Sequence, residues 1–113
     1  MQEIALVAVV SSVTDITSPP LLLNDNDGVY IQVLISGSDV VGTLSLQASA
    51  DNVTYITVAG SSQAVASSSD HAWNVSGLNA KYVRVFWDYT SGTGNISMQA
   101  NIKSPAVTQV IAR

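Results

Sequence analysis

His71 is the only histidine in the sequence, and it directly follows Asp70 and a run of serines at positions 67–69. Serine, histidine and aspartate can form a hydrolytic triad when the three side chains converge in space. Adjacent residues on a strand point to opposite faces, so Asp70 is poorly placed to orient the His71 ring. The chain also has no Gly-x-Ser-x-Gly nucleophile elbow. We therefore predict no catalytic residue and treat the protein as a non-enzyme.

Residues 24–28, Asn-Asp-Asn-Asp-Gly, gather oxygen-bearing side chains of the kind that Ca²⁺ prefers. An EF-hand loop with Gly28 as its glycine needs an acidic ligand where Leu23 stands and a bidentate glutamate where Leu34 stands. Asp25 and Asp27 are thus left as weak candidates for a calcium site at the edge of a sandwich. Asn, Asp and Gly also favour tight turns for backbone reasons alone. We predict a turn here, with no bound metal or cofactor.

Aromatic side chains provide the remaining candidate binding chemistry. Tyr55, Trp73 and Tyr89 lie near predicted loops and could stack on the rings of a carbohydrate. This arrangement would make the protein a carbohydrate-binding or adhesion module.

A second aromatic group lies on the predicted strand 82–89. If its valines and Trp87 face the core, then Tyr82, Arg84 and Phe86 share the opposite face with Asp88. Aromatic residues and arginine are enriched at protein interfaces. The alternative is that a loop of the same domain covers Tyr82 and Phe86. The face is therefore a candidate interface or ligand surface.

The elements that would position these residues are all strands. Apolar residues alternate with polar ones at a period of two, and clusters of Gly, Pro, Asn, Asp and Ser separate the segments. No segment of ten or more residues keeps a helical period. The segments predict an all-β, antiparallel β-sandwich of jelly-roll or Ig-like type with about seven to nine strands. The predicted strands fall at 3–14, 21–23, 29–35, 44–49, 53–58, 73–75, 82–89, 96–102 and 106–111.

Both ends of the chain are apolar and are candidate interface strands. The run 4–10, which includes Ile4 and Leu6, would invite aggregation as an exposed edge, so we expect it to be central in a sheet or paired with a neighbour. The segment 106–111, which includes Val107 and Ile111, follows a proline. Residues 1–14 and 105–113 are therefore predicted as strand arms that pair within the subunit or between subunits.

Only 12 of the 113 residues are charged, and 47% are hydrophobic. Four basic residues cannot build the positive surface that nucleic acid requires. The absence of cysteine excludes disulfides and thiolate chemistry. The apolar run at the start is too short to span a bilayer, and Glu3 precedes it where a signal peptide would carry positive charge. We predict one domain over residues 1–113 that contacts neither nucleic acid nor membrane.

The stretch 42–103 carries a pattern that resembles known proteins. Residues 42–55 read as a strand, an acidic turn and an aromatic-bearing strand, Lys-Tyr-Val-Arg-Val follows at 81–85, and Ser-Gly-Thr-Gly at 91–94 leads into the last long strand. This pattern resembles the small β-sandwich structural proteins of bacteriophages that decorate capsids or form tails and spikes. It is also similar, more weakly, to discoidin-type sandwich domains, which often bind carbohydrate or lipid through loops.

The phage resemblance implies a non-enzymatic virion protein, made in the host cytoplasm and assembled with itself or with other virion proteins through β-sandwich faces and terminal strands. Low charge and apolar termini are consistent with a subunit whose surface is partly covered by others. The alternative is a discoidin-like carbohydrate-binding or adhesion module that recognises a surface glycan.

Overall fold

The computed structural model describes the backbone of residues 2–23, 28–75 and 80–103, and the side chains of residues 6–23, 28–75 and 80–101. The prediction of an all-β fold is confirmed, although the described residues form ten strands rather than seven to nine, because four of the ten have only two or three residues. No helix long and apolar enough to cross a membrane occurs in these ranges. The strands are β1 (Gln2–Ser11), β2 (Ile16–Thr17), β3 (Leu21–Leu22), β4 (Gly28–Ser36), β5 (Val41–Ser49), β6 (Ile56–Thr57), β7 (Gln63–Val65), β8 (Ser69–Val75), β9 (Tyr82–Ser91) and β10 (Asn95–Lys103).

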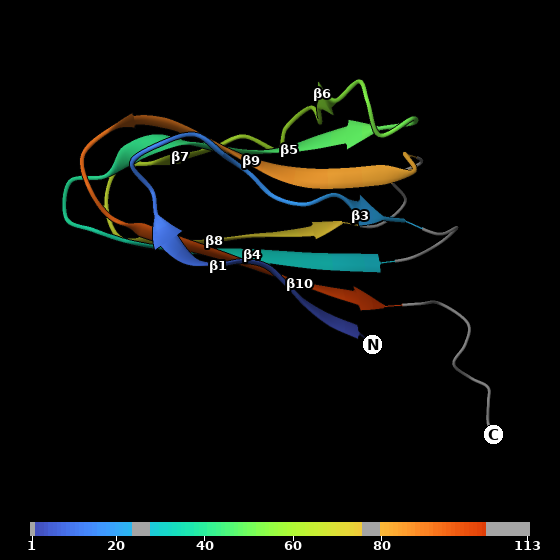
Figure 1. The fold of residues 1–113 in the computed structure, drawn as a ribbon, viewed down its shortest axis with the longest axis horizontal. Coiled ribbons are helices and arrows are strands. Elements are labelled where there is room, and N and C mark those ends of the chain that lie inside the picture. Colours follow the sequence, from blue (N-terminus) through green and yellow to red (C-terminus); the bar gives the residue numbers. More distant parts are fainter. Residues whose placement is uncertain (1, 24–27, 76–79, 104–113) are drawn as a thin grey trace.

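The strands form two antiparallel sheets that pack face to face (Figure 1). Sheet A has the order β1-β10-β4-β8. In sheet B, β9 and β5 are central; β2 and β3 pair with β9, while β6 and β7 pair with β5. If β2–β3 and β6–β7 each count as one interrupted strand, the chain has eight strands. Numbered along the chain, these eight strands have the order 1-8-3-6 in sheet A and 2-7-4-5 in sheet B. This is the connectivity of a jelly roll, so the topology decides between the two sandwich types that the sequence left open.

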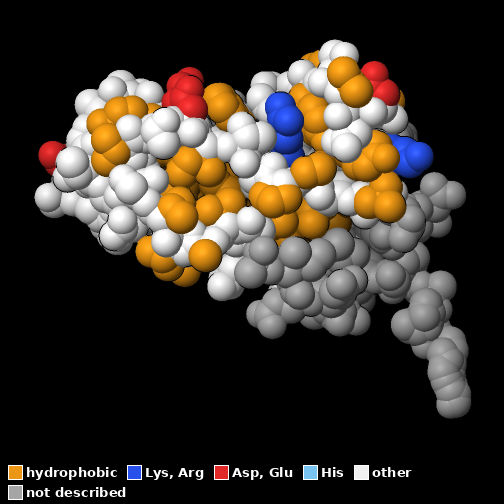
Figure 2. Space-filling view, in the orientation of Figure 1, with side chains coloured by type: hydrophobic (Ala, Val, Ile, Leu, Met, Phe, Trp, Pro, Cys, Tyr) orange, Lys and Arg blue, Asp and Glu red, His pale blue; other side chains and the backbone are white. Residues whose placement is uncertain are grey.

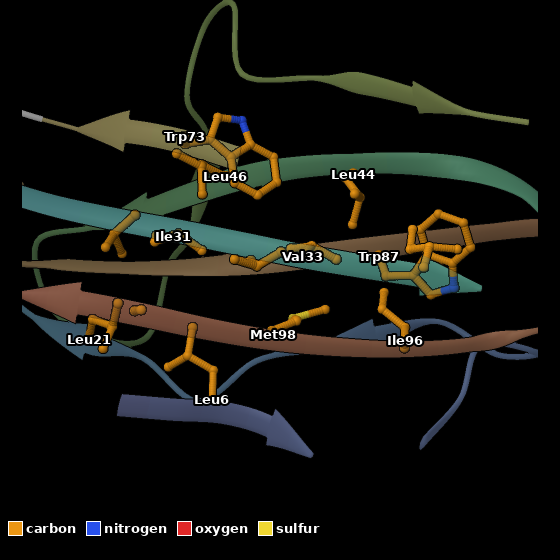
Figure 3. Packing of buried hydrophobic residues seen from close by; sticks show 14 of the residues in the cluster. Leu6, Leu21, Ile31, Val33, Leu44, Leu46, Trp73, Trp87, Ile96 and Met98 are labelled. Carbon is orange, nitrogen blue, oxygen red and sulfur yellow. The ribbon is translucent and has the colours of Figure 1, made fainter. Parts of the chain in front are cut away.

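The core lies between the sheets and is built from alternating residues of the long strands (Figure 3). On β4, β9 and β10, every second side chain is buried and the ones between face outward. The buried set includes Val33, Val85 and Met98, each fully enclosed. The two tryptophans lie toward opposite ends of this core. Burial of one large apolar side chain contributes about 1.5–3 kcal/mol, so this layer is the main source of stability.

Trp87 on β9 fixes the point where the chain passes from sheet A to sheet B. Its fully buried indole N–H donates to the carbonyl of Ser12, 2.9 Å away, and the Ser12 N–H donates to the carbonyl of Gly94 at 3.0 Å. The ring lies against Gly42 of β5, where a Cβ atom would collide with it. The crossover after β1 is therefore positioned by a tryptophan that only a glycine neighbour can accommodate.

Two serine side chains complete sheet B where its outer strands are interrupted. Between β2 and β3, Ser18 donates its backbone N–H to the Val85 carbonyl at 2.9 Å, and its Oγ accepts the Val85 N–H at 2.8 Å. Between β6 and β7, the Ser61 Oγ accepts the Leu46 N–H at 3.1 Å. Val85 and Leu46 are partners in the β5–β9 pairing. Both serines thus stand at one level of the sheet and replace missing strand residues on either side of it.

The edges of both sheets are short, irregular or partly occupied. The first strand, β1, is an edge strand that pairs only with β10 among the described strands, and its pairing shifts between Ala5 and Val7 and again between Val7 and Val10. At the other edge of sheet A, the Gln63 side-chain amide donates to the Ala72 carbonyl of β8 at 3.1 Å. Bulges and short edge strands are recognised devices against edge-to-edge pairing. Of the two alternatives expected for the apolar N-terminal run, the central position is not observed, because β1 lies at the edge of sheet A with β10 as its partner.

We predict that Ser18→Ala and Ser61→Ala each lower the free energy of unfolding by about 1–3 kcal/mol, because each leaves a buried backbone N–H without an acceptor. Urea unfolding measures the change. Ser62→Ala is the matched control, since Ser62 is exposed and adjacent to Ser61; its effect is expected to stay within about 0.5 kcal/mol. Equal, small effects of all three substitutions would contradict the bridging role of the two hydroxyls.

Candidate interaction surface

The outer face of sheet B gathers most of the aromatic and arginine side chains that the sequence singled out. On β9, Tyr82, Arg84 and Phe86 are half-buried and alternate with the fully buried core residues. Leu22 of β3 is the register partner of Tyr82 and is 51% exposed. Tyr55 joins the group from the loop before β6. We call these five residues the aromatic–arginine face.

Arg84 is held at the centre of this face by two contacts. Its guanidinium carbon lies 3.7 Å from the centroid of the Tyr55 ring, which is a stacked cation–π arrangement. Its Nε–H donates to the Gln47 Oε1 of β5 at 2.8 Å. Because Gln47 and Arg84 are register partners, this hydrogen bond lies along the pairing direction of the sheet. The arginine is therefore ordered before any partner binds.

The turn at residues 49–54 carries Tyr55 to this position. The Asp51 Oδ1 accepts the backbone N–H groups of Val53 and Thr54, both at 2.9 Å, and the Ser49 hydroxyl at 2.9 Å. Asn52 adopts a positive φ of 62°, which Asn tolerates better than most residues. Its side-chain oxygen accepts the Tyr55 hydroxyl. The acidic turn is thus a rigid support for the aromatic ring.

The same hydrogen bonds govern the charge state of Asp51. The backbone N–H of Thr54, and then that of Val53, stabilise the carboxylate and hold the pKa of Asp51 below its usual range. A carboxyl group with a lowered pKa in the folded state contributes stability above its unfolded pKa and loses it as pH falls. The turn is therefore best ordered at neutral pH.

The carbohydrate platform expected from Tyr55, Trp73 and Tyr89 is not assembled. Trp73 is 9% exposed in the core, and its indole N–H donates to the Ser61 carbonyl at 2.8 Å. Tyr89 lies on the inner side of β9, packs against the core and donates its hydroxyl to the Gly92 carbonyl at 2.7 Å. Tyr55 lies on the outer side of sheet B. The sequence placed Trp73 at the start of a short predicted strand beside a loop, whereas in the structure it lies within the longer β8 and faces inward.

His71 does not complete a catalytic triad with Asp70. It shares the inward side of β8 with Ser69, whose Oγ lies 2.7 Å from Nε2, while Asp70 is exposed on the other side. The His71 Nδ1 lies 2.8 Å from the Oε1 of Gln63 on β7. A neutral amide therefore orients the ring, where a triad uses a carboxylate that stabilises the imidazolium. The contacts tie the edge of sheet A to sheet B.

The remaining candidates fall at the termini and in the turn at 24–28. Leu6 lies in the core, so it stabilises the sandwich rather than presenting an interface. Ile4 pairs with Ala100 through the backbone of β1, and its side chain is outside the described set. Asp25, Asp27, Val107 and Ile111 lie outside the described residues, as does the C-terminal arm.

Charge on the described surface is sparse and scattered. Figure 2 shows isolated acidic and basic side chains separated by uncharged polar and hydrophobic ones. Sequence reasoning missed Leu22 as a member of the aromatic–arginine face and Gln47 as the residue that holds Arg84 there. Strand alternation places Gln47 outward with Ser45, but nothing in the sequence indicates that β5 pairs with β9 in this register.

The fold places the chain among the all-β jelly-roll sandwiches. Its structure is similar to that of the SPBc2 prophage-derived protein YomS, with a TM-score of 0.56 and 12% sequence identity over 90% of this chain and 92% of that protein. At this identity the likeness concerns the fold. No family model matches the sequence, and no curated protein matches it.

We predict that Asp51→Asn reduces stability at neutral pH and also flattens the loss of stability on acidification below about pH 4, because the carboxylate that the turn stabilises is no longer present. Thermal unfolding between acidic and neutral pH measures both effects. Asp88→Asn, at an exposed position of β9, is the control and should leave the pH profile of the parent protein intact. An identical pH profile for Asp51→Asn would contradict the assignment.

Proposed function

We propose that the protein is a non-enzymatic structural subunit of a bacteriophage particle, and that it assembles with copies of itself through the aromatic–arginine face. The likeness to a prophage-derived protein supports a phage setting at the level of fold. The low charge content supports a subunit role, since 12 charged residues give little electrostatic protection to a free-standing chain.

The proposal rests on the composition of the aromatic–arginine face and on the fixed position of its arginine side chain. Tyrosine and arginine dominate the energetically important centres of protein interfaces. Here Arg84 is already fixed by Tyr55 and Gln47, so its side chain loses less freedom on association than a mobile one would. Leu22 adds an exposed apolar group beside Tyr82. The face therefore has the chemistry of an interface centre.

The size of the molecule is sufficient for such an interface. A standard interface buries about 800 Å² on each partner, which is about one eighth of the 6060 Å² that this chain exposes. At about 25 cal/mol per Å² of apolar area, 800 Å² on one subunit would supply at most about 20 kcal/mol, against about 4–15 kcal/mol for lost freedom of motion. One face of the sandwich is thus large enough for a stable contact.

Contacts through faces are favoured over strand addition at the edges. The bulges of β1 and the Gln63 amide on β8 interrupt the two edges of sheet A, and sheet B ends in strands of two or three residues. Strand addition needs a regular row of free backbone groups. Of the two modes of assembly expected from the sequence, sheet faces and terminal strands, we therefore propose the stacking of sheet faces.

We predict that the full-length protein sediments as an oligomer at high micromolar concentration and that Leu22→Asp shifts it to monomer, since a buried unpaired carboxylate is costly. Sedimentation equilibrium measures the mass. Val9→Asp is the matched control: Val9 is 71% exposed on β1, away from the aromatic–arginine face, and this variant should keep the parent mass. A monomeric parent protein, or dissociation by Val9→Asp but not by Leu22→Asp, would overturn the proposal.

A further inference from the structure

The outer face of sheet A has a different composition from that of sheet B. Register pairing places Tyr30 of β4 between Asn101 of β10 and Asn74 of β8. In the next outward-facing row, Gln32 lies between Gln99 of β10 and Ala72 of β8. One aromatic ring is thus flanked by carboxamide side chains on both sides and along its own strand.

These residues form a shallow pocket. It is lined by Tyr30, Gln32, Gln99, Ala100 and Asn101, and its volume is about 220 Å³, including space open to solvent. The pocket is much smaller and more open than the enclosed sites of about 300–1,000 Å³ that hold drug-sized molecules. A ligand would therefore rest on the face of the sheet and extend beyond the pocket.

The polar groups of the pocket can both donate and accept hydrogen bonds. The Gln32 Nε2 donates to the Gln99 Oε1 at 3.1 Å, which aligns the two amides. The Gln32 Oε1 remains an acceptor and the Gln99 NH₂ remains a donor. A hydroxyl group can also donate and accept a hydrogen bond, so a neighbouring donor and acceptor can bind it together. Tyr30, which is 41% exposed, offers a flat apolar surface beside them.

Charge is nearly absent among the side chains of this face that the structure describes. Of the described side chains that point outward from β4, β8 and β10, only Asp70 is charged, and its register partner Leu34 is two residues beyond Gln32. A charged ligand would find no counter-charge in the pocket. A neutral ligand rich in hydroxyl groups would lose little by leaving water, because the amides replace its hydrogen bonds.

We propose that the outer face of sheet A binds a neutral carbohydrate, with one sugar ring stacked on Tyr30 and its hydroxyls bonded by the side chains of Gln32, Gln99 and Asn101. This site is distinct from the loop platform of Tyr55, Trp73 and Tyr89. It lies on the opposite side of the sandwich from the aromatic–arginine face, so a subunit that assembles through sheet B keeps sheet A free. The inference does not depend on the assembly proposal.

The test is an NMR titration of the ¹⁵N-labelled full-length protein with maltohexaose, cellohexaose, chitohexaose, laminarihexaose and mannohexaose at millimolar concentration. At least one should give saturable shifts centred on Tyr30, Gln32 and Gln99. Tyr30→Ala should weaken that binding by about tenfold or more, whereas Tyr30→Phe should keep it within about threefold, because the ring is retained. Val53→Ala is the control and should bind as the parent does, because Val53 is 81% exposed in the loop between β5 and β6 and belongs to neither proposed surface.

Several results would overturn the proposal. These are the absence of binding by all five oligosaccharides, binding that survives Tyr30→Ala, and equal loss in Val53→Ala. Tighter binding of hexagalacturonate than of every neutral hexasaccharide would also refute the neutral specificity. Chemical shifts at Tyr30 that change with protein concentration but not with added sugar would identify the face as a contact between copies. Tyr30 is partly exposed, so its variants should fold, and their thermal unfolding is checked first.

Discussion

The interrupted outer strands of sheet B depend on a single row of hydrogen bonds across that sheet. Ser18, Val85, Leu46 and Ser61 stand side by side, with a serine hydroxyl at each end in place of a backbone carbonyl. Because the serine hydroxyls accept the hydrogen bonds that strand carbonyls would otherwise accept, the outer strands can be interrupted without leaving buried N–H groups unpaired. At one end the break admits two consecutive prolines. At the other, the Ser61 carbonyl is free to accept the indole of Trp73 and so to tie sheet B to β8.

The two outer faces of the sandwich have separate chemistry because each is built by a different part of the chain. On sheet B, the Asp51 turn delivers Tyr55 to Arg84, so two sequence motifs that lie 29 positions apart become one rigid surface. On sheet A, the register of β4 with β10 brings glutamine opposite glutamine and tyrosine opposite asparagine. A single layer of core residues between them supports both faces.

Strand alternation made much of this architecture predictable. The inward positions of Val83, Val85 and Trp87, and hence the shared outer face of Tyr82, Arg84 and Phe86, follow from a period of two. Alternation says nothing about which strand lies alongside, so the contact of Arg84 with Gln47 and Tyr55 could not be predicted.

One error has a clear physical origin. Trp73 in a short polar segment resembles an exposed residue, but its indole is bound by the Ser61 carbonyl, a distant partner for which the local sequence carries no signal. The hydrogen bonds of Ser18 to Val85 have no local signal either. The same holds for the side-chain amide of Gln63, which meets His71 only because the topology places β7 near β8.

The irregular edges of this sandwich have a consequence for its behaviour in solution. Many proteins keep strand edges apart by placing lysine or glutamate on them, and that repulsion weakens as salt screens the charges. Here the bulges of β1, the short strands of sheet B and the amide of Gln63 protect the edges by shape and hydrogen bonding. Protection of this kind is independent of ionic strength. The strand edges of a nearly uncharged chain can therefore stay protected in brine as well as in dilute buffer.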